Sequence, residues 1–168
     1  MTATSAGNAA PTEAGTRMDR TSERELVVTR TIDGPARIVF DAWTTPELMQ
    51  RWWVPKSVPI TLQSVEMDVR VGGTYRLVFQ VDPTTTMAFV GRYLEVDPPK
   101  RLVWTNEEGD GEAVVTTLTL DEDEGRTRLR VHDLYPSKDA LDDAIASESI
   151  PGWSEMLDQL DDLLRTTG

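Results

Sequence analysis

Residues 60–134 alternate apolar and polar side chains with a period of two, and this pattern constrains the fold more than any other feature of the sequence. Tyr75, Leu77 and Phe79, for example, occupy every second position. Because successive side chains of a β-strand point to opposite faces, this spacing predicts strands with one buried face. Short sequences rich in glycine, proline and aspartate divide the region into about six antiparallel strands. Such a sheet needs a second layer to cover its apolar face.

Shorter elements are predicted before these strands. Residues 25–32 are dense in β-branched side chains and predict a first strand. Two short helices follow, and each has a proline, Pro35 or Pro46, at its first position, where the missing N–H costs nothing. Thr45 is the expected N-cap of the second helix. The chain therefore enters the sheet through one strand and two helical segments.

The C-terminal segment predicts a long helix that begins at Ser137 and bends or restarts near Pro151-Gly152. Beyond this break, the aspartates at 158, 161 and 162 are expected on the solvent-exposed face. This helix is the only element long enough to cover the sheet, so the order of elements predicts an α+β fold in which a curved antiparallel sheet of about six or seven strands grips it. The apolar stripe of the helix consists of Trp153, Met156, Leu157, Leu160, Leu163 and Leu164.

The length of the chain, 168 residues, fits a single domain with a substantial core. We expect this domain to span residues 24–168. Residues 1–23 are rich in alanine, threonine, serine and glycine, and they lack the apolar stretch of a secretory signal. With almost nothing to bury, they are expected to form a flexible tail.

The charge and the cysteine count limit the partners and the location. The formal net charge is −12. Phosphate backbones and anionic membrane surfaces both attract basic proteins, so neither nucleic acid nor membrane is an expected partner. The chain contains no cysteine, which excludes disulfides and thiolate metal ligands and is compatible with a reducing cytoplasm. We therefore expect a cytoplasmic protein, as a monomer or a homodimer.

Two adjacent tryptophans, Trp52 and Trp53, stand where the second helix meets Pro55. An indole buries on the order of 200 Å² and carries an N–H that needs a hydrogen-bond acceptor. Three explanations are open: the pair packs in the protein's own core, borders a cavity and contacts a ligand there, or binds another chain. Packing is the default for tryptophan.

Five segments taken together resemble one known family. Their order and spacing, over about residues 24–166, are similar to those of the bacterial homologues of the activator of heat-shock-protein-90 ATPase, in the START-like (SRPBCC) superfamily. The resemblance implies a helix-grip fold of the birch-pollen-allergen type and, as in many members, a ligand cavity. The segments are Phe40-Asp-Ala-Trp-Thr-Thr-Pro-Glu47, Arg51-Trp-Trp-Val-Pro-Lys56, Gly72-Gly-Thr-Tyr75, Glu95-Val-Asp-Pro-Pro-Lys-Arg-Leu-Val-Trp104 and Gly152-Trp-Ser-Glu-Met-Leu157.

The chain departs from the pattern of this family at Val54 and Val71, where the family usually has glycine and often proline, respectively. Val54 adds bulk beside the tryptophan pair. We therefore expect it to narrow any cavity opening that this loop borders.

Inward-facing aromatic positions define a candidate ligand cavity between the sheet and the C-terminal helix. Tyrosine and tryptophan bring polar atoms into such an interior, which a purely structural core does not require. A solid packed core is the alternative. The facing of Tyr93 depends on whether its strand has a bulge near Gly91. The candidate ligand-binding residues are Trp43, Trp52, Trp53, Met67, Tyr75, Leu77, Phe79, Phe89, Tyr93, Trp104, Asn106, Trp153 and Leu157.

No residue pattern predicts a metal site, a cofactor or a catalytic centre. His132 is the single histidine, and it shares strand parity with Arg128 and Arg130, so it is expected on the outer face of the sheet. The acidic segments 107–112 and 121–124 do not match a calcium-binding loop and are expected to be solvated turns. Neither a nucleophile elbow nor a phosphate-binding loop occurs.

Three functions are compatible with these features. The first, which we favour, is binding of a small apolar or aromatic molecule in the cavity. The second is a co-chaperone that docks on the heat-shock ATPase, as the family name implies, with the acidic surface facing a basic patch. The third is an enzyme of the cyclase or hydratase type, which needs a buried titratable or polar group such as Glu95, Tyr93 or Asn106 facing the cavity.

Overall fold

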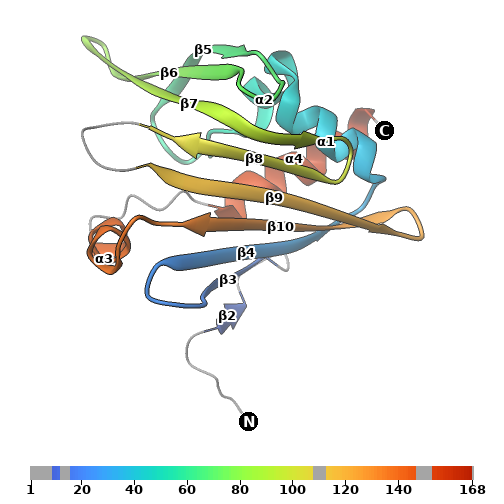
Figure 1. Ribbon diagram of the computed structural model, residues 1–168. Helices are drawn as coiled ribbons and strands as arrows, with labels where there is room; N and C mark the ends of the chain where they lie inside the picture. The colour runs from blue at the N-terminus through green and yellow to red at the C-terminus, as the bar shows by residue number, and fades with distance from the viewer. Residues whose placement is uncertain (1–8, 12–15, 108–112, 147–152, 168) are drawn as a thin grey trace.

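The computed structural model describes residues 9–11, 16–107, 113–146 and 153–167 (Figure 1). The strands are β2 (Ala9–Pro11), β3 (Arg17–Arg20), β4 (Glu25–Ile32), β5 (Thr61–Met67), β6 (Thr74–Asp82), β7 (Thr85–Asp97), β8 (Arg101–Asn106), β9 (Val114–Asp123) and β10 (Arg126–Leu134). The helices are α1 (Ala36–Thr44), α2 (Pro46–Trp52), α3 (Lys138–Ala146) and α4 (Trp153–Thr167).

The predicted α+β helix-grip architecture is confirmed. In the described part of the chain, nine strands form one sheet in the order β2-β3-β4-β10-β9-β8-β7-β6-β5. From β5 to β10 each strand pairs antiparallel with its neighbour in sequence, as the short turns between them require. Helices α1, α2 and α4 lie on one face of this sheet (Figure 1). No helix in the described ranges combines the length and the apolar character of a membrane span.

Part of the N-terminal segment belongs to the sheet, which corrects the expectation of a flexible tail over residues 1–23. β3 pairs antiparallel with β4, and β2 pairs with β3. The guanidinium of Arg20 also lies 2.7 Å from a carboxylate oxygen of Asp142 in α3. The backbone N–H and C=O groups at the edge of β4 can hydrogen-bond to a further strand of any side-chain composition. Composition, which describes side chains only, therefore missed this pairing.

The helix ends follow local sequence signals in part. Ser137 caps α3 as predicted, because its Oγ accepts a hydrogen bond from the backbone N–H of Ala140 at 3.0 Å. Thr45 occupies the N-cap position of α2, but its side chain makes no capping hydrogen bond. The predicted break at residues 151–152 lies outside the described residues.

Helices α4 and α2 cover opposite ends of the inner face of the sheet. α4 packs against β4, α1 and α2, and α2 packs against β5 at the other end of the sheet. The side chains of the apolar stripe predicted for α4 are all buried. This arrangement places α2 over the β5 end of the sheet and α4 over β4, while α1 lies against β9 and β10 and contacts both helices.

One aspartate of α4 is buried, which corrects its predicted place on the solvent face. Asp161 is 8% exposed, and its Oδ2 accepts a hydrogen bond from Arg30 Nη2 of β4 at 3.2 Å. Arg30 Nη1 also donates to Asp158 at 2.6 Å and to the hydroxyl of Thr16 at 2.9 Å. Asp158 keeps partial exposure and Asp162 is exposed, as predicted. An ion pair therefore lies between β4 and the helix that covers it.

Candidate functional site

All five tryptophans of the chain meet in one cluster centred on Trp43 of α1. The ring centroid of Trp43 lies 4.8 Å from that of Trp52, 5.5 Å from Trp53, 5.7 Å from Trp104 and 6.1 Å from Trp153. Each such aromatic contact adds about 0.5–1.5 kcal/mol beyond the area that it buries. The cluster therefore ties α1, α2, α4 and β8 together.

The adjacent tryptophans have different surroundings. Trp52 is fully buried, and its Nε1 donates a hydrogen bond to the carbonyl of Ala42 at 3.0 Å. Trp53 is half-buried and borders a cavity. Packing thus accounts for Trp52, while Trp53 is the member of the pair that faces open space.

The loop that follows the pair is held to α4 by two side chains. The Nε2 of Gln159 donates to the carbonyls of Trp52 and Val54 at 3.1 and 2.9 Å. Glu155 accepts hydrogen bonds from the hydroxyl and the backbone N–H of Ser57, and these bonds hold the pKa of Glu155 below its usual value. Val54 packs against the core but does not line the cavity, so its expected role at the cavity opening is wrong.

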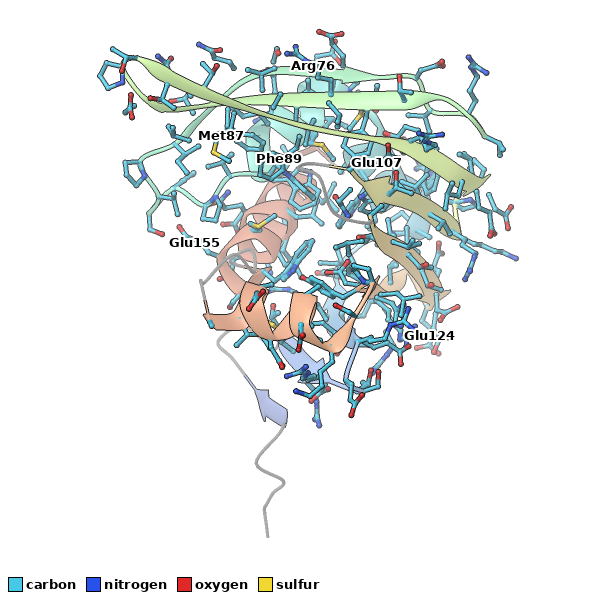
Figure 2. All side chains as sticks on the ribbon, turned by 60° about the vertical axis from the view of Figure 1, so that its left-hand side comes forward. Arg76, Met87, Phe89, Glu107, Glu124 and Glu155 are labelled. Atoms are coloured by element: carbon cyan, nitrogen blue, oxygen red, sulfur yellow. The ribbon has the colours of Figure 1, made fainter. Side chains whose placement is uncertain are left out.

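A cavity of about 40 Å³ lies between the α1–α2 segment and strands β5 to β8. One water needs roughly 10–15 Å³ measured in this way, so the cavity has room for a few waters or a small group of atoms. Phe89, one of its lining residues, extends from β7 toward the helical side of the sheet (Figure 2). The lining residues are Trp43, Met49, Trp53, Met67, Tyr75, Leu77, Phe89, Tyr93, Leu102, Trp104 and Asn106.

Most of the predicted site residues line this cavity, and four do not. Trp52, Phe79, Trp153 and Leu157 lie outside its lining, while Met49 and Leu102 belong to it and were not predicted. None of the described residues of α4 lines the cavity, which corrects its predicted position against that helix. The reason is that Trp153 of α4 stacks on Trp43, and Trp43 forms the cavity wall on that side. Periodicity shows which face a residue occupies but not which element lies opposite.

The side chain of Tyr93 faces the inner side of the sheet because the register shift of β7 comes after Tyr93 in the chain. The register shift falls between Tyr93 and Glu95 rather than at Gly91. The ring of Tyr75 lies against Gly91, and its hydroxyl reaches past this residue to the carbonyl of Thr105 in β8 at 2.6 Å. Glycine at position 91 therefore gives this tyrosine its place in the cavity wall.

A chain of polar side chains leads from the cavity wall into the core. Asn106 Oδ1 lies 3.1 Å from the Tyr75 hydroxyl, and Asn106 Nδ2 donates to the hydroxyl of Thr116 at 2.9 Å. The Thr116 hydroxyl in turn donates to Asp133 Oδ1 at 2.6 Å. Burial raises the pKa of Asp133 to about 6, although the hydrogen bond from Thr116 opposes this shift. A titrating acid thus lies two hydrogen bonds behind the cavity surface.

Asp133 was not predicted, although strand parity contains the signal that finds it. Leu129 and Val131 of β10 alternate with the outward-facing arginines and face inward, and Asp133 follows at the next inward position. His132 faces outward as predicted, with its Nε2 2.7 Å from a carboxylate oxygen of Glu25. Aspartate is rarely buried, so composition alone places it at the surface.

Replacing Asp133 with asparagine is expected to remove a dependence of folding stability on pH between about 4 and 6. An unfolded aspartate has a pKa of about 3.9, whereas the pKa of Asp133 in the fold is about 6. The stabilisation from this group is therefore complete below the unfolded pKa and is lost as the pH rises through the folded pKa. The whole change corresponds to about 3 kcal/mol.

Urea unfolding of the wild type and Asp133→Asn at several pH values between 4 and 7 measures this effect. Asp162→Asn, on the exposed face of α4, is the matched control and should keep the pH dependence of the wild type. An Asp133→Asn protein whose stability follows the same pH curve as the wild type would contradict the assignment.

Two further predicted positions lie at the surface. Glu95 of β7 forms an ion pair with Arg101 at 2.9 Å, with both side chains more than 40% exposed, so it does not face the cavity. The acidic segment 121–124 is exposed, as predicted. Glu122 of this segment nevertheless accepts a hydrogen bond from the first backbone N–H of α1, that of Ala36, at 2.8 Å. Of the acidic segment 107–112, only residue 107 lies within the described residues.

An antiparallel sheet that holds helices on one face, with a cavity walled by tryptophan and tyrosine between the two layers, defines a helix-grip protein. The chain belongs to the family described as Activator of Hsp90 ATPase homolog 1-like protein, whose sequence model matches residues 33–165. This match confirms the resemblance carried by the five sequence segments. A comparison with curated proteins found no significant match.

Several solved bacterial structures share the fold. A crystal structure from Nitrosomonas europaea is 27% identical and has a TM-score of 0.74, covering 88% of this chain and 98% of its own. One from Chromobacterium violaceum is 28% identical with a TM-score of 0.68, covering 83% of this chain and 96% of its own. A third, from Rhodobacter sphaeroides, is 23% identical with a TM-score of 0.79, covering 91% of this chain and 99% of its own, and shows the fold alone.

Proposed function

We propose that this protein binds a small uncharged molecule of apolar or aromatic character in the cavity under α1 and α2. The observation that carries this proposal is the lining itself: a cavity of about 40 Å³ is walled by tryptophan, tyrosine, phenylalanine, leucine and methionine. Apolar walls with a few polar groups are typical of small-molecule sites. A packed core of the same residues leaves no such space.

The lining also indicates the charge of the ligand. Among the described lining residues, Asn106 is the only one outside the apolar and aromatic types, and none carries a charge. A charged ligand buried there would lose its hydration without a counter-charge, which costs several kcal/mol. An uncharged ligand avoids this penalty.

The volume limits the ligand to a few heavy atoms unless side chains move. Met49 and Met67 line the cavity, and methionine adapts its shape readily because it is unbranched and flexible. Trp53 and Phe89 are only partly buried, so they have room to shift at the edge of the cavity. Ligands of the size of a five- or six-membered ring are therefore the first to test.

Thermal unfolding and ligand-detected NMR with a panel of uncharged ring compounds test the proposal. A ligand present at about one hundred times its Kd should stabilise the fold by about 2.7 kcal/mol. Leu77→Phe places extra volume in the cavity and should weaken binding at least tenfold, whereas Leu157→Met, in the core outside the cavity, should not. If no compound raises the Tm and Leu77→Phe only stabilises the protein, the cavity is a packing defect and the proposal fails.

The family description supports a second candidate, stimulation of a heat-shock ATPase by direct docking. The formal charge of −12 suits a basic docking surface, because opposite charges increase the association rate. Titration of the bacterial heat-shock-90 ATPase with this protein tests the candidate. A rise in ATPase rate that weakens with salt would support it, and an unchanged rate would exclude it.

A further inference from the structure

Trp53 is the one described lining residue of the cavity that belongs to neither a strand nor a helix. It follows the last residue of α2 and begins a turn, residues 53–57, that leads toward β5. The other half-buried residues of the wall, Met67, Phe89 and Asn106, lie in strands that are paired with their neighbours in the sheet. The wall therefore reaches the surface at three places held by the sheet and at one place held by a turn.

The backbone of residues 53–57 is bonded only locally in the described part of the chain. The N–H of Trp53 donates to the carbonyl of Met49 in α2 at 3.0 Å, and the N–H of Val58 donates to the carbonyl of Pro55 at 3.1 Å. No backbone hydrogen bond between described residues joins this turn to the sheet. A segment with few backbone hydrogen bonds to other elements opens locally at a low free-energy cost.

A side chain of α4 supplies the attachment that the backbone of the turn lacks. Gln159 Nε2 donates to the carbonyls of Trp52 and Val54 at 3.1 and 2.9 Å. Gln159 Oε1 accepts from the backbone N–H of Lys56 at 2.8 Å. These three backbone groups lie on both sides of Trp53 in the chain. Gln159 does not line the cavity itself, so it acts on the cavity wall through the position of Trp53.

From this arrangement we infer that Gln159 is a positioning residue, which holds Trp53 over the entrance of the cavity, and that ligands enter and leave when residues 53–57 separate from α4. This inference rests on the proposed function and adds the route to the site. Glu155 strengthens the attachment through its hydrogen bonds from Ser57. Because Gln159 contacts the turn and not the cavity, its loss changes the rates of binding and release much more than the affinity.

Fluorobenzene, an uncharged six-membered ring, is the probe, and fluorine NMR gives its association rate, dissociation rate and Kd. Gln159→Leu removes all three hydrogen bonds, so both rates should rise about tenfold, the value of one or two net hydrogen bonds. The Kd should change by less than about threefold. Gln159→Glu keeps the shape of the side chain but places a carboxylate oxygen against the two carbonyls, so it should raise both rates as well.

Gln80→Leu is the matched control for these variants. Gln80 of β6 is also half-buried and also donates to a backbone carbonyl, that of Pro83, at 3.4 Å. It lies outside the cavity wall and away from the turn. The rates measured with Gln80→Leu should equal those of the wild type.

Tryptophan fluorescence follows the turn without any ligand. Trp53 is half-buried while the other four tryptophans are buried, so quenching by acrylamide reports mainly on Trp53. Gln159→Leu should raise the quenching constant about twofold, because the turn opens more often. Adding Trp53→Phe to Gln159→Leu should remove this increase, and Gln80→Leu should show none.

The outcomes separate the entrance from the binding function. Fluorobenzene that binds with the same rates in the wild type and in both Gln159 variants would overturn the entrance and leave the binding function standing. Rates that rise equally in Gln80→Leu would show a general loosening of the fold and would also overturn the role of Gln159. Fluorobenzene that binds to neither the wild type nor any variant would overturn the binding function and the entrance together.

Discussion

Replacing Arg30 with methionine is expected to lower the free energy of unfolding by about 3–5 kcal/mol, the cost of removing one partner from a buried ion pair. Arg30 on the inner face of β4 is 7% exposed, and it donates to Asp158, Asp161 and Thr16. Without the guanidinium, Asp161 remains buried, and Arg165, at 3.4 Å, is its one remaining cationic partner among the residues that the structure describes. Arg165 is 59% exposed, so water screens most of its attraction.

Two further variants make this prediction specific. Arg128→Met removes an arginine from the exposed face of β10 and should change stability by no more than about 0.5 kcal/mol. The double variant Arg30→Met with Asp161→Leu replaces the pair by apolar groups and should recover most of the loss, because no uncompensated buried charge remains. Urea denaturation of the four proteins measures these differences. A loss no larger than that of Arg128→Met, or a double variant as unstable as the single one, would contradict this account.

Gly91→Ala is expected to destabilise the fold by about 3 kcal/mol or more, beyond the usual range for an added methyl group. A Cβ at position 91 would lie 1.9 Å from the carbonyl oxygen of Thr105 and 2.7 Å from both the ring and the hydroxyl oxygen of Tyr75. The clash with Thr105 involves backbone, so β7 and β8 must move apart to relieve it. That movement also breaks the hydrogen bond from the Tyr75 hydroxyl to the same carbonyl.

Gly34→Ala is the matched control. A Cβ at Gly34 meets only the side chain of Ile38, at 3.0 Å from its flexible end. The added methyl group also lowers the entropy of the unfolded chain, so the net change should stay within about 1 kcal/mol. Thermal and urea unfolding of both variants give the comparison. Equal stability of Gly91→Ala and Gly34→Ala would show that β7 and β8 separate at little cost.

Local sequence signals predicted the elements of this fold well. The alternation at Tyr75, Leu77 and Phe79 placed these residues on the buried face of β6, and the helical spacing from Trp153 to Leu164 placed the apolar stripe of α4. Both are properties of a single element, because the period of side-chain direction depends only on the local backbone. The pairing of β3 with β4 was missed because backbone groups rather than side chains make it.

The candidate site was predicted less completely because a cavity belongs to several elements at once. The candidate residues included Tyr93 and Asn106 of its wall, although strand parity left the facing of Tyr93 open, and Trp153 and Leu157 were assigned to it from the face of α4 alone. The stacking of Trp153 on Trp43 moves α4 away from the cavity, and no spacing rule contains that contact. Met49 and Leu102 were missed for the same reason, since neither is distinctive in its own segment.

The sequence by itself determined the order of strands and helices from β4 onward, most of their inward and outward faces and the family, because these depend on residue type and local spacing. Only the tertiary structure decided which inward residues meet. It separates a fully packed Trp52 from a cavity-facing Trp53, and it joins Arg30 to Asp161 across 131 positions of the chain. The physical reason is that a contact over such a separation depends on the layering of whole elements. It is the layering of α1, α2 and α4 over the sheet that leaves the cavity between the α1–α2 segment and strands β5 to β8.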